Sequence, residues 1–452
     1  MYIQRTIDKY LLEWKNAPTH KPLLLRGARQ VGKSSAIRQL GRTFKYYIEV
    51  NFESRDDFKE IFKQLSDVHE IANRLGLIFS KPIVPGETLL FLDEIQACPN
   101  AIHSLWFFKE DYPELHVVAA SSLLEFALKD LGAYGVGRIR SMFVYPMSFD
   151  EFLTATGQEG LLRTKRNSSP TNPLPEAFYN RLVEAFRSYM LVGGMPEAVA
   201  IYSETGSYRH SSDIVNEIIQ GYQDDFAKYG AKANPLLLRQ TLISVAHQAG
   251  AKFVYSRVEG QYRSAEVKVA LEMLKDAGLI IPTYHTDANG VPLGAEINER
   301  VVKYLIHDTG VLLGILGIDD DIDDSIKEMM VADSIDLVDK GHVAEMMAGL
   351  ELIKYSSPQK RHQLYYWQNM NKGTCAEVDY VIARSGSIVP IEVKSGVKGS
   401  MSSMYSLMRN PQKHIEMGIR CSLENFGTFE SPDGKKIDII PLYAISNLFA
   451  EK

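Results

Sequence analysis

The chain has 452 residues, of which 45% are hydrophobic and 23% charged, a composition typical of a soluble globular protein with two or three domains. No apolar run approaches the length of a membrane span and the first residues lack the order of a signal peptide, so we expect a cytoplasmic protein with no membrane partner. The net charge of -6 excludes a global basic field, so any contact with nucleic acid must use a local patch.

The first motif is a phosphate-binding loop between an apolar strand and a helix, in KPLLLRGARQVGKSSAIRQL. Its glycines let backbone N–H groups curl around phosphate oxygens, and the start of the helix adds the positive end of its dipole. Lys33 is placed to reach the β- and γ-phosphates of ATP, and Ser34 to ligate Mg²⁺. The residues predicted to bind the nucleotide are Gly27, Ala28, Arg29, Gln30, Val31, Gly32, Lys33 and Ser34.

An acidic pair at the end of a later strand supplies the second half of this site. The run GETLLFLDEIQ predicts a buried strand that ends in Asp93 and Glu94. Asp93 is suited to hold Mg²⁺, and Glu94 to orient the attacking water as a catalytic residue. The alternative is a glycine-rich turn beside an unrelated acidic pair, but the complete order of strand, loop, helix and acidic strand end argues against it. We therefore predict ATP binding.

Polar residues also follow the next strand. LHVVAASSLLEF predicts a buried strand that ends at Ser121, where a hydroxyl can sense the γ-phosphate. The alternative role is a helix N-cap for LLEFAL. Arg138 and Arg140 then precede another strand, in GVGRIRSMFVYP. One of them, for which we choose Arg138, is a candidate arginine finger, and the alternative is an ordinary surface arginine. A finger that acts on a neighbouring copy would require an oligomer.

The middle of the chain begins with a stretch rich in Ser, Pro, Asn and basic residues, from Gly157 to Glu176. Because this stretch lacks hydrophobic periodicity, it predicts a linker or a long exposed loop at a domain border. A helix is predicted from about Glu176 to Val192. The double glycine that follows suits a helix stop and a tight turn.

Residues 234–306 show a helix-turn-helix pattern and then two apolar runs around Asn289-Gly290 that predict a hairpin. This order resembles a winged helix-turn-helix. The second helix, SAEVKVALEMLKDAGL, has a predicted buried stripe of Val267, Ala270, Leu271 and Leu274. Its polar faces carry three acids and two lysines, whose effects on phosphate cancel. We therefore favour a structural or protein-contacting role over base reading.

Near the end of the chain, EVDYVIARSGSIVPIEVKSG predicts a β-hairpin from Glu377 to Gly396. A two-residue turn at Ser385-Gly386 pairs Arg384 with Ser387. In this register one face of the hairpin is apolar throughout, which supports the register independently. The apolar residues are Val378, Tyr380, Ile382, Val389, Ile391 and Val393.

The other face of the predicted hairpin is charged. The register places Asp379 directly opposite Glu392, and Glu377 opposite Lys394. Two carboxylates whose Cβ atoms lie about 5 Å apart repel each other unless a cation sits between them, and Mg²⁺ or Mn²⁺ is the natural cation. The alternative is a solvated face on which Glu377 and Lys394 form an ordinary cross-strand ion pair.

Taken in order, these motifs resemble a family of prokaryotic AAA-like P-loop ATPases with a C-terminal restriction-endonuclease-like domain, which has long been described as of unknown function. The resemblance covers nearly the whole chain, and it is carried by RGARQVGKS, LFLDEIQ, ASSLLEF, Gly137-Arg138, YPMSFDEFL, GGMPEAV, KYLIHDTGVL, GHVAE and EVDYVIARSGSIVPIEVKSG. It implies that Asp379 and Glu392 hold a metal ion and that Lys394 orients or activates the attacking water. It also implies an acidic metal ligand from a preceding helix, to which Glu345 corresponds.

We therefore expect an α/β protein with four regions: an AAA-like P-loop ATPase domain (1–157), a linker and helical region (158–233), a winged-helix-like region (234–306) and a restriction-endonuclease-like α/β domain (307–452). The first functional hypothesis is an ATP-regulated, Mg²⁺-dependent nuclease that acts on DNA, with Mn²⁺ as a second metal for the C-terminal site. The competing hypothesis is an ATP-driven interaction protein whose nuclease-like domain binds nucleic acid or protein without cleavage.

Overall fold

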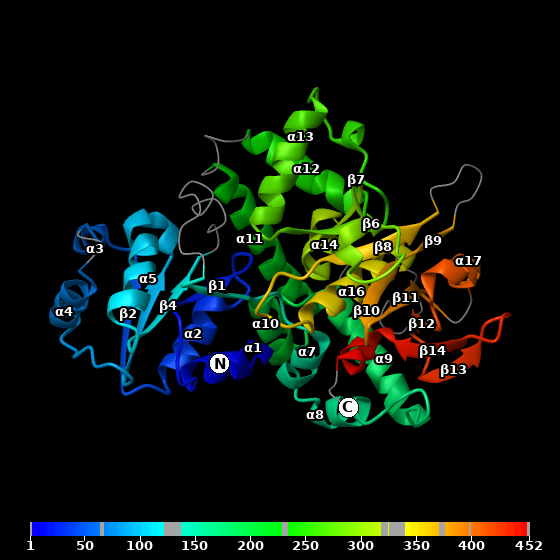
Figure 1. Ribbon diagram of the computed structural model, residues 1–452, viewed down its shortest axis with the longest axis horizontal. Helices are drawn as coiled ribbons and strands as arrows, with labels where there is room; N and C mark the ends of the chain where they lie inside the picture. The colour runs from blue at the N-terminus through cyan, green and yellow to red at the C-terminus, as the bar shows by residue number, and fades with distance from the viewer. Residues whose placement is uncertain are drawn as a thin grey trace. The chain divides into compact units, whose positions relative to one another are not determined.

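The computed structural model describes residues 2–63, 67–121, 137–227, 234–317, 324, 340–369, 376–396 and 399–449. Over these ranges the chain divides into two compact units (Figure 1). The N-terminal unit consists of Met1–Tyr145 and two short later segments, Asp276–Leu279 and Ser357–Arg361. The C-terminal unit consists of Pro146–Lys275, Ile280–Ser356 and His362–Lys452. No helix within the described ranges is long and apolar enough to cross a lipid bilayer.

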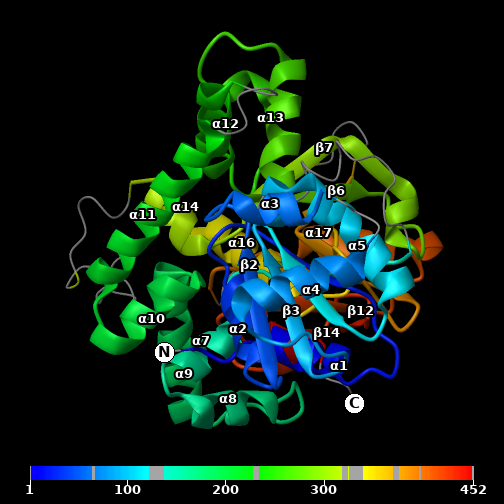
Figure 2. The ribbon, with the colours of Figure 1, turned by 90° about the vertical axis from the view of Figure 1, so that its left-hand side faces the viewer.

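The described part of the N-terminal unit contains a five-stranded parallel sheet with the strand order β2-β3-β4-β1-β5 (Figure 2). Its strands are β1 (Leu23–Arg26), β2 (Tyr46–Asn51), β3 (Thr88–Asp93), β4 (His116–Ala120) and β5 (Arg140–Phe143). Its helices are α1 (Thr6–Lys15), α2 (Lys33–Gly41), α3 (Asp57–Ile61), α4 (Val68–Phe79) and α5 (Pro99–Asp111), with a 3-10 turn, η1 (Ile95–Ala97).

Helices on both faces of this sheet explain its sequence pattern. The helices α3, α4 and α5 pack on one face, against Ile48, Leu90 and Val117, whereas α2 packs against β3 and β4 on the other (Figure 1). Every residue of β3 and β4 is therefore buried, which is why their sequences are continuous apolar runs without alternation. The strands predicted before the phosphate-binding loop, before Asp93 and before Ser121 are confirmed as β1, β3 and β4.

The C-terminal unit begins with helices. Those described are α7 (Phe149–Ala155), α8 (Glu159–Arg166), α9 (Glu176–Val192), α10 (Pro196–Thr205), α11 (Tyr208–Phe226), α12 (Pro235–His247) and α13 (Ser264–Asp276). The helix predicted from Glu176 to Val192 is confirmed as α9. It ends at Gly193, whose φ of 78° is a conformation that favours glycine.

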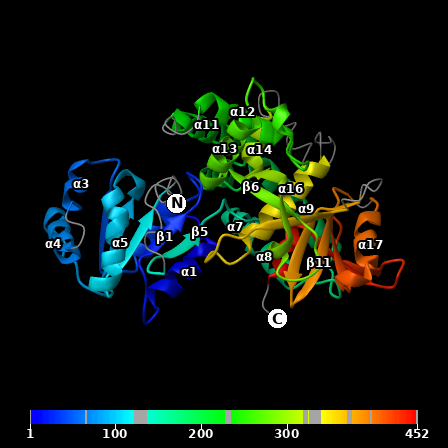
Figure 3. The ribbon, with the colours of Figure 1, turned by 45° about the horizontal axis from the view of Figure 1, so that its top comes forward.

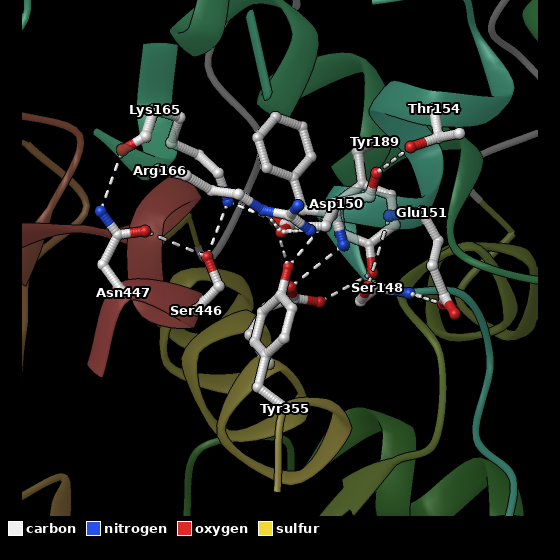
Figure 4. A network of polar contacts seen from close by, with 12 residues as sticks. Ser148, Asp150, Glu151, Thr154, Lys165, Arg166, Tyr189, Tyr355, Ser446 and Asn447 are labelled. Atoms are coloured by element: carbon white, nitrogen blue, oxygen red, sulfur yellow. Dashed lines mark hydrogen bonds and ion pairs between the residues drawn. The ribbon is translucent and has the colours of Figure 1, made fainter. Parts of the chain in front are cut away.

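The stretch that we expected to be a long exposed loop, Gly157–Glu176, instead contains α8, in which Leu161, Leu162 and Lys165 are buried. The prediction was wrong because composition alone does not distinguish a buried lysine, such as Lys165, from a solvated one. The ammonium of Lys165 pairs with the carboxylate of Asp150, to which the Tyr355 hydroxyl also donates, 2.8 Å away (Figure 4). A charged group satisfied in this way can enter a protein interior.

The two predicted helices and the hairpin are present, but residues 248–263 and not a short turn join the helices. The stripe of Val267, Ala270, Leu271 and Leu274 is buried as expected. The hairpin strands are β6 (Ile280–Thr286) and β7 (Ile297–Ile306). The second strand starts later than the apolar run after Gly290 suggested, because the connection forms a 3-10 turn, η4 (Leu293–Glu296). In the described part of the unit this hairpin belongs to a four-stranded sheet of order β7-β6-β8-β9, with β8 (Leu364–Gln368) and β9 (Glu377–Val378).

The second sheet of this unit, within the same described residues, has five strands in the order β10-β11-β12-β14-β13 (Figure 1), and Figure 3 shows β11 with α17 from a second side. The strands are β10 (Tyr380–Arg384), β11 (Ser387–Val393), β12 (Met417–Ser422), β13 (Gly427–Glu430) and β14 (Lys436–Pro441). The remaining elements are α14 (Thr309–Ile315), α16 (Lys340–Lys354), α17 (Ser402–Arg409), η3 (Tyr255–Arg257), η5 (Pro411–Lys413) and η6 (Leu442–Leu448). Met404 and Leu407 of α17 share a core with Val381 and Ile388 of β10 and β11, whereas α16 packs against β7 and β11.

The predicted hairpin register is confirmed over β10 and β11, since Arg384 pairs with Ser387 and Tyr380 with Ile391. The expected cross-strand pair of Glu377 with Lys394 is wrong. The chain bends at Asp379, and Glu377 belongs to β9, where it pairs with Gln368 of β8 instead of β11. The alternating pattern on both sides of the bend gave no sign that the strand changes its partner there.

Candidate nucleotide site and candidate metal centre

The phosphate-binding loop runs from the end of β1 to the start of α2. A Cβ atom on Gly27, whose φ is 144°, would lie 2.1 Å from the carbonyl oxygen of Val144. Gly32 precedes α2 with a φ of 91°. Only glycine fits these two positions, the first for lack of space and both because of their backbone conformation. The carboxyl ends of parallel strands meet at one edge of a sheet, so this loop lies at the edge where β3 and β4 also end.

Lys33 is buried inside the loop. Its Nζ donates to the carbonyl oxygens of Gly27 and Ala28, at 2.9 and 2.6 Å. Burial lowers the pKa of Lys33 to about 8, against the opposing effects of Glu94 and Asp93. Because carbonyl oxygens carry no full negative charge, this ammonium remains strongly attractive to a phosphate.

Ser34 and Asp93, the two predicted Mg²⁺ ligands, lie together. The Ser34 hydroxyl donates to Asp93 Oδ1 at 3.1 Å, and so does the backbone N–H of Glu94. Burial raises the pKa of Asp93, and the nearby charge of Glu94 adds to this effect. Glu94 itself has a φ of 50°, a strained conformation for a residue with a side chain and one that is frequent at functional sites.

A glutamine that we did not predict connects Glu94 to Ser121. Gln96 Nε2 donates to Glu94 Oε2 at 2.8 Å, and the buried Ser121 hydroxyl donates to Gln96 Oε1 at 2.5 Å. The predicted catalytic acid and the predicted phosphate sensor are thus two hydrogen bonds apart. The only sequence signal for this link was an amide two residues after Glu94.

Arg5 is a second residue that sequence reasoning missed. It precedes α1, is buried, and donates from Nη1 to the carbonyl oxygen of Val31 at 2.9 Å and from Nη2 to that of Tyr145 at 2.8 Å. It therefore supports the phosphate-binding loop from a position far away in the sequence, where no local pattern indicates it.

The candidate arginine finger, Arg138, contacts α5. Its Nε donates to Glu110 Oε1 at 2.6 Å, and its guanidinium carbon lies 5.2 Å from the centre of the Trp106 ring. Arg140 is the first residue of β5. The described contacts of Arg138 within its own chain are thus with a helix surface, and none of them is with the loop Gly27–Ser34.

In the C-terminal unit, Glu345 is held by a lysine that the sequence analysis overlooked. Lys303 Nζ lies 2.8 Å from Glu345 Oε1 and 2.5 Å from Glu377 Oε1, and 5.1 Å from the centre of the Tyr366 ring. These groups come from β7, α16, β9 and β8, and Lys303 is only 1% exposed. A lysine inside the apolar run of INERVVKYLI was the available signal.

Asp379 and Glu392 have different partners. The backbone N–H of Val393 donates to Asp379 Oδ2 at 2.7 Å, and Lys394 Nζ donates to Glu392 Oε1 at 2.7 Å. Lys394 therefore pairs with Glu392, two residues before it, and not with Glu377. The second oxygen of Glu392, Oε2, is buried and has no hydrogen-bond partner among the described residues.

Four carboxylates, those of Glu345, Glu377, Asp379 and Glu392, are close enough to affect one another's protonation. Burial raises the pKa of Glu345 to about 8 and that of Glu392 to about 7, and the charge of Asp379 contributes to both shifts. Burial also raises the pKa of Asp379. For Lys303 burial lowers the pKa, but Glu345 and Glu377 together outweigh it and raise the pKa above its usual range. The structure thus brings Glu345, Asp379 and Glu392 into one electrostatic cluster.

Comparisons with known proteins identify the N-terminal region. Residues 19–153 match the family model described as an AAA domain. The chain carries an AAA-type P-loop ATPase domain. Two further stretches, 183–322 and 340–445, match models described only as domains of unknown function, DUF8612 and DUF4143. The comparison with curated proteins found no match.

Solved structures similar to the chain include the ORC1 protein of Aeropyrum pernix in complex with DNA. It is 14% identical, with a TM-score of 0.30, over 70% of this chain and 94% of that one. The C. elegans protein PCH-2 is also 14% identical, with a TM-score of 0.23, over 45% of this chain and 62% of that one. Because both TM-scores are low, we infer neither fold nor function from these similarities.

The acids of the C-terminal unit have the chemistry of a divalent-cation site. An all-oxygen donor set suits Mg²⁺ or Mn²⁺, and the unpartnered Oε2 of Glu392 is the kind of buried atom that a cation satisfies. Across the described ranges, however, no three His, Cys, Asp or Glu side chains are arranged around a common metal position. The ion pairs of Lys303 give the physical reason, since they draw Glu345 and Glu377 toward an ammonium.

Proposed function

We propose that the ATPase domain binds ATP with Mg²⁺ and hydrolyses it, and that the acids of the C-terminal unit form a metal-dependent nuclease site that acts on DNA. The observation that carries the first part is the meeting of Lys33, Ser34, Asp93 and Glu94 at one sheet edge. The second part is supported by the buried carboxylate of Glu392 and the half-buried carboxylate of Asp379, with Lys394 bound to Glu392.

In the proposed ATPase reaction Lys33 binds the β- and γ-phosphates, and Ser34 and Asp93 would hold Mg²⁺, which would neutralise charge on the phosphate oxygens. Glu94 orients the attacking water and accepts its proton as the water oxygen bonds to the γ-phosphorus, and the bond to the β–γ bridging oxygen breaks so that ADP leaves. Gln96 and Ser121 fix the position of the Glu94 carboxylate, and the Ser121 hydroxyl is placed to report the γ-phosphate to Glu94 through Gln96. Arg5 keeps Val31, and with it the loop, in place.

In the proposed nuclease reaction Glu345, Asp379 and Glu392 would hold a divalent cation, which would supply Lewis-acid chemistry at a phosphodiester. Lys394, held beside Glu392 at 2.7 Å, orients the attacking water and stabilises negative charge on the phosphate. The backbone N–H of Val393 fixes the Asp379 carboxylate. We propose that ATP turnover regulates this site, because both sites occur in one chain.

A second candidate function is favoured by Lys303. Because this ammonium pairs with both Glu345 and Glu377, it offsets part of the negative charge of the acid cluster without a metal. The C-terminal unit would then bind DNA or a protein without cleavage, and the chain would act as an ATP-driven interaction protein.

The ATPase proposal is tested by nucleotide affinity and steady-state hydrolysis in wild type, Lys33→Ala and Glu94→Gln. Lys33→Ala is expected to lose ATP affinity, and Glu94→Gln to keep affinity but lose hydrolysis. Lys45→Ala is the control, because Lys45 forms an exposed ion pair with Glu87 on the same unit. Unchanged ATP affinity in Lys33→Ala would refute the proposal.

The nuclease proposal is tested with supercoiled and single-stranded DNA in Mg²⁺ or Mn²⁺, with and without ATP. Wild type is expected to cleave, and Asp379→Ala and Glu392→Ala are expected not to. Asp433→Ala is the matched control, since Asp433 is a carboxylate of the same unit that pairs with Arg409 at the surface. The absence of cleavage under every condition, or equal cleavage by Asp379→Ala, would leave the interaction protein as the better account.

The arginine finger is a separate proposal, in which Arg138 acts on a neighbouring copy in an oligomer. Arg138→Ala is then expected to lower the rate of ATP hydrolysis per chain, and wild-type activity is expected to rise with protein concentration. Arg42→Ala, a substitution of another arginine of the ATPase domain, is the control. A concentration-independent rate that Arg138→Ala leaves unchanged would refute this role.

A further inference from the structure

We propose that Lys303 is an internal counter-ion of the C-terminal acid cluster, which a divalent cation must displace from Glu345 before it can bind. This inference rests on the proposed metal site and adds a regulatory device to it. The metal site would then exist in two forms, one closed by the lysine and one open to the cation.

The first support is the position of the Lys303 ammonium. It lies between two carboxylates, 2.8 Å from Glu345 Oε1 and 2.5 Å from Glu377 Oε1, distances of direct charge-assisted hydrogen bonds. The lysine side chain is 2% exposed, and the ring of Tyr366 lies 5.1 Å from Nζ. An ammonium held from three sides occupies the place that a cation would take beside Glu345.

The second support concerns the two oxygens of Glu345. Oε1 is the atom that accepts from Lys303, whereas Oε2 lies beside Gly250, where an added Cβ would be 3.1 Å away. A bulkier residue than glycine at position 250 would therefore crowd Oε2, while Oε1 is the oxygen that Lys303 holds. For Glu345 to turn an oxygen toward Asp379 and Glu392, its contact with Lys303 must open.

The third support is that Glu377 can keep Lys303 as an ion-pair partner after the contact between Lys303 and Glu345 opens. The side chain of Glu377 is 28% exposed, compared with 10% for that of Glu345. Lys303 can therefore keep its pair with Glu377 near the solvent while Glu345 turns to a metal. On the other side of the cluster, the buried Oε2 of Glu392 lacks a partner among the described residues and gains one when a cation enters.

The direct test is the Mn²⁺ affinity of the full-length protein, measured by electron paramagnetic resonance of the unbound ion. Lys303→Met is expected to bind Mn²⁺ at least about tenfold more tightly than wild type, because a competing unit charge about 3 Å from a carboxylate is removed. Lys354→Met is the matched control. Lys354 is a buried lysine of α16 paired with Glu351 at 3.5 Å, and it lies nine residues, or about 13 Å, along the helix from Glu345.

A second variant separates displacement from a general effect of charge. Lys394→Met also removes one positive charge next to a carboxylate of the cluster, but Lys394 contacts Glu392 alone among the four acids. We expect Lys394→Met to increase Mn²⁺ affinity by less than Lys303→Met. Equal increases in both variants, or no increase in Lys303→Met, would overturn the proposal.

Because Lys303→Met removes a buried partner and can unfold the unit, wild type provides an independent test. A carbodiimide joins a lysine to a glutamate that it contacts, so mass spectrometry should find Lys303 linked to Glu345 in chelator, with or without a further link to Glu377. Saturating Mn²⁺ should abolish the link to Glu345. A Lys303–Glu345 link that persists in Mn²⁺, or that is absent in chelator, contradicts the proposal.

The results distinguish this inference from the proposed function. If Mn²⁺ binds to wild type and Asp379→Ala abolishes that binding while Lys303→Met has no effect, the metal site stands and the counter-ion role falls. If Mn²⁺ binds neither wild type nor Lys303→Met, both the proposed metal site and the counter-ion role of Lys303 are refuted.

Discussion

Two buried lysines, Lys33 and Lys303, show opposite ways of placing a positive charge inside a protein. Lys33 donates to two neutral carbonyl oxygens, and burial lowers its pKa to about 8. Lys303 donates to two carboxylates, which raise its pKa above the usual range despite burial. The first lysine is an unneutralised charge ready for a phosphate, and the second is neutralised by its own chain. The partners of a buried lysine, and not its burial, therefore separate a binding site from a structural ion pair.

The largest effect is expected from Lys303→Met in the presence of a chelator. Removal of one member of a buried ion pair leaves uncompensated charge and costs about 3–5 kcal/mol. Urea unfolding, with hydrogen exchange to assign the transition to the C-terminal unit, measures this loss. Lys436→Met, which breaks an exposed pair with Asp438, should cost less than about 1 kcal/mol. Equal losses of unfolding free energy in Lys303→Met and Lys436→Met would show that the buried ion pairs of Lys303 contribute no more than an exposed pair.

Lys33→Met is expected to change the free energy of unfolding in the opposite direction, toward greater stability. A lysine whose folded pKa of about 8 lies below the ordinary 10.5 contributes most stability above pH 10.5, and loses it as the pH falls toward 8. At pH 7 the buried charge therefore costs stability, and its removal should stabilise the N-terminal unit by up to about 3 kcal/mol without nucleotide. Thermal unfolding measures this gain. A loss of stability in Lys33→Met would show that its two hydrogen bonds outweigh the cost of burial.

The pH dependence of ATP affinity tests the same lysine in wild type. ATP requires the charged form of Lys33, so affinity should fall as the pH rises through about 8, by up to about tenfold per pH unit above it. If the Lys33→Arg variant still binds ATP, its affinity should depend little on pH, because a guanidinium stays charged. Calorimetric titrations between about pH 7 and 9.5 provide the measurement, and a flat wild-type profile would contradict the lowered pKa.

The smallest effect is expected from Gln96→Ala, which breaks the link between Glu94 and Ser121. The variant loses two hydrogen bonds, of which only the one to Glu94 holds the catalytic carboxylate. One hydrogen bond contributes about 0.5–1.5 kcal/mol, so ATP hydrolysis should slow about two- to tenfold while ATP affinity stays unchanged. Steady-state kinetics measure the rate of hydrolysis, and binding titrations measure ATP affinity. Gln4→Ala, a substitution of an exposed glutamine of the same unit, is the control. A fall in affinity with an unchanged rate would place Gln96 in nucleotide binding.

The phosphate-binding loop could be predicted because all its parts are adjacent in the sequence. Gly27 and Gly32 are required by the backbone itself, and Lys33 follows at a fixed distance. The register of β10 and β11 could also be predicted, since a one-residue slip would move every apolar side chain to the wrong face.

The supports of both sites could not be predicted, because their partners lie far away in the chain. Arg5 contacts Val31, and Lys303 contacts Glu345 and Glu377, yet neither residue stands in a motif. The strand change at Asp379 was hidden because alternation reports which face a residue occupies but not which strand it pairs with. In both units local patterns gave the groups proposed to do chemistry, and tertiary structure added the groups that hold them.

The most direct test of the central claim is anomalous diffraction from crystals of the wild-type protein soaked in Mn²⁺. The account predicts one ion with Glu345, Asp379 and Glu392 as ligands, and Lys303 withdrawn from Glu345 but still near Glu377. No ion at these acids, or an ion bound while the contact between Lys303 and Glu345 remains at 2.8 Å, would contradict it.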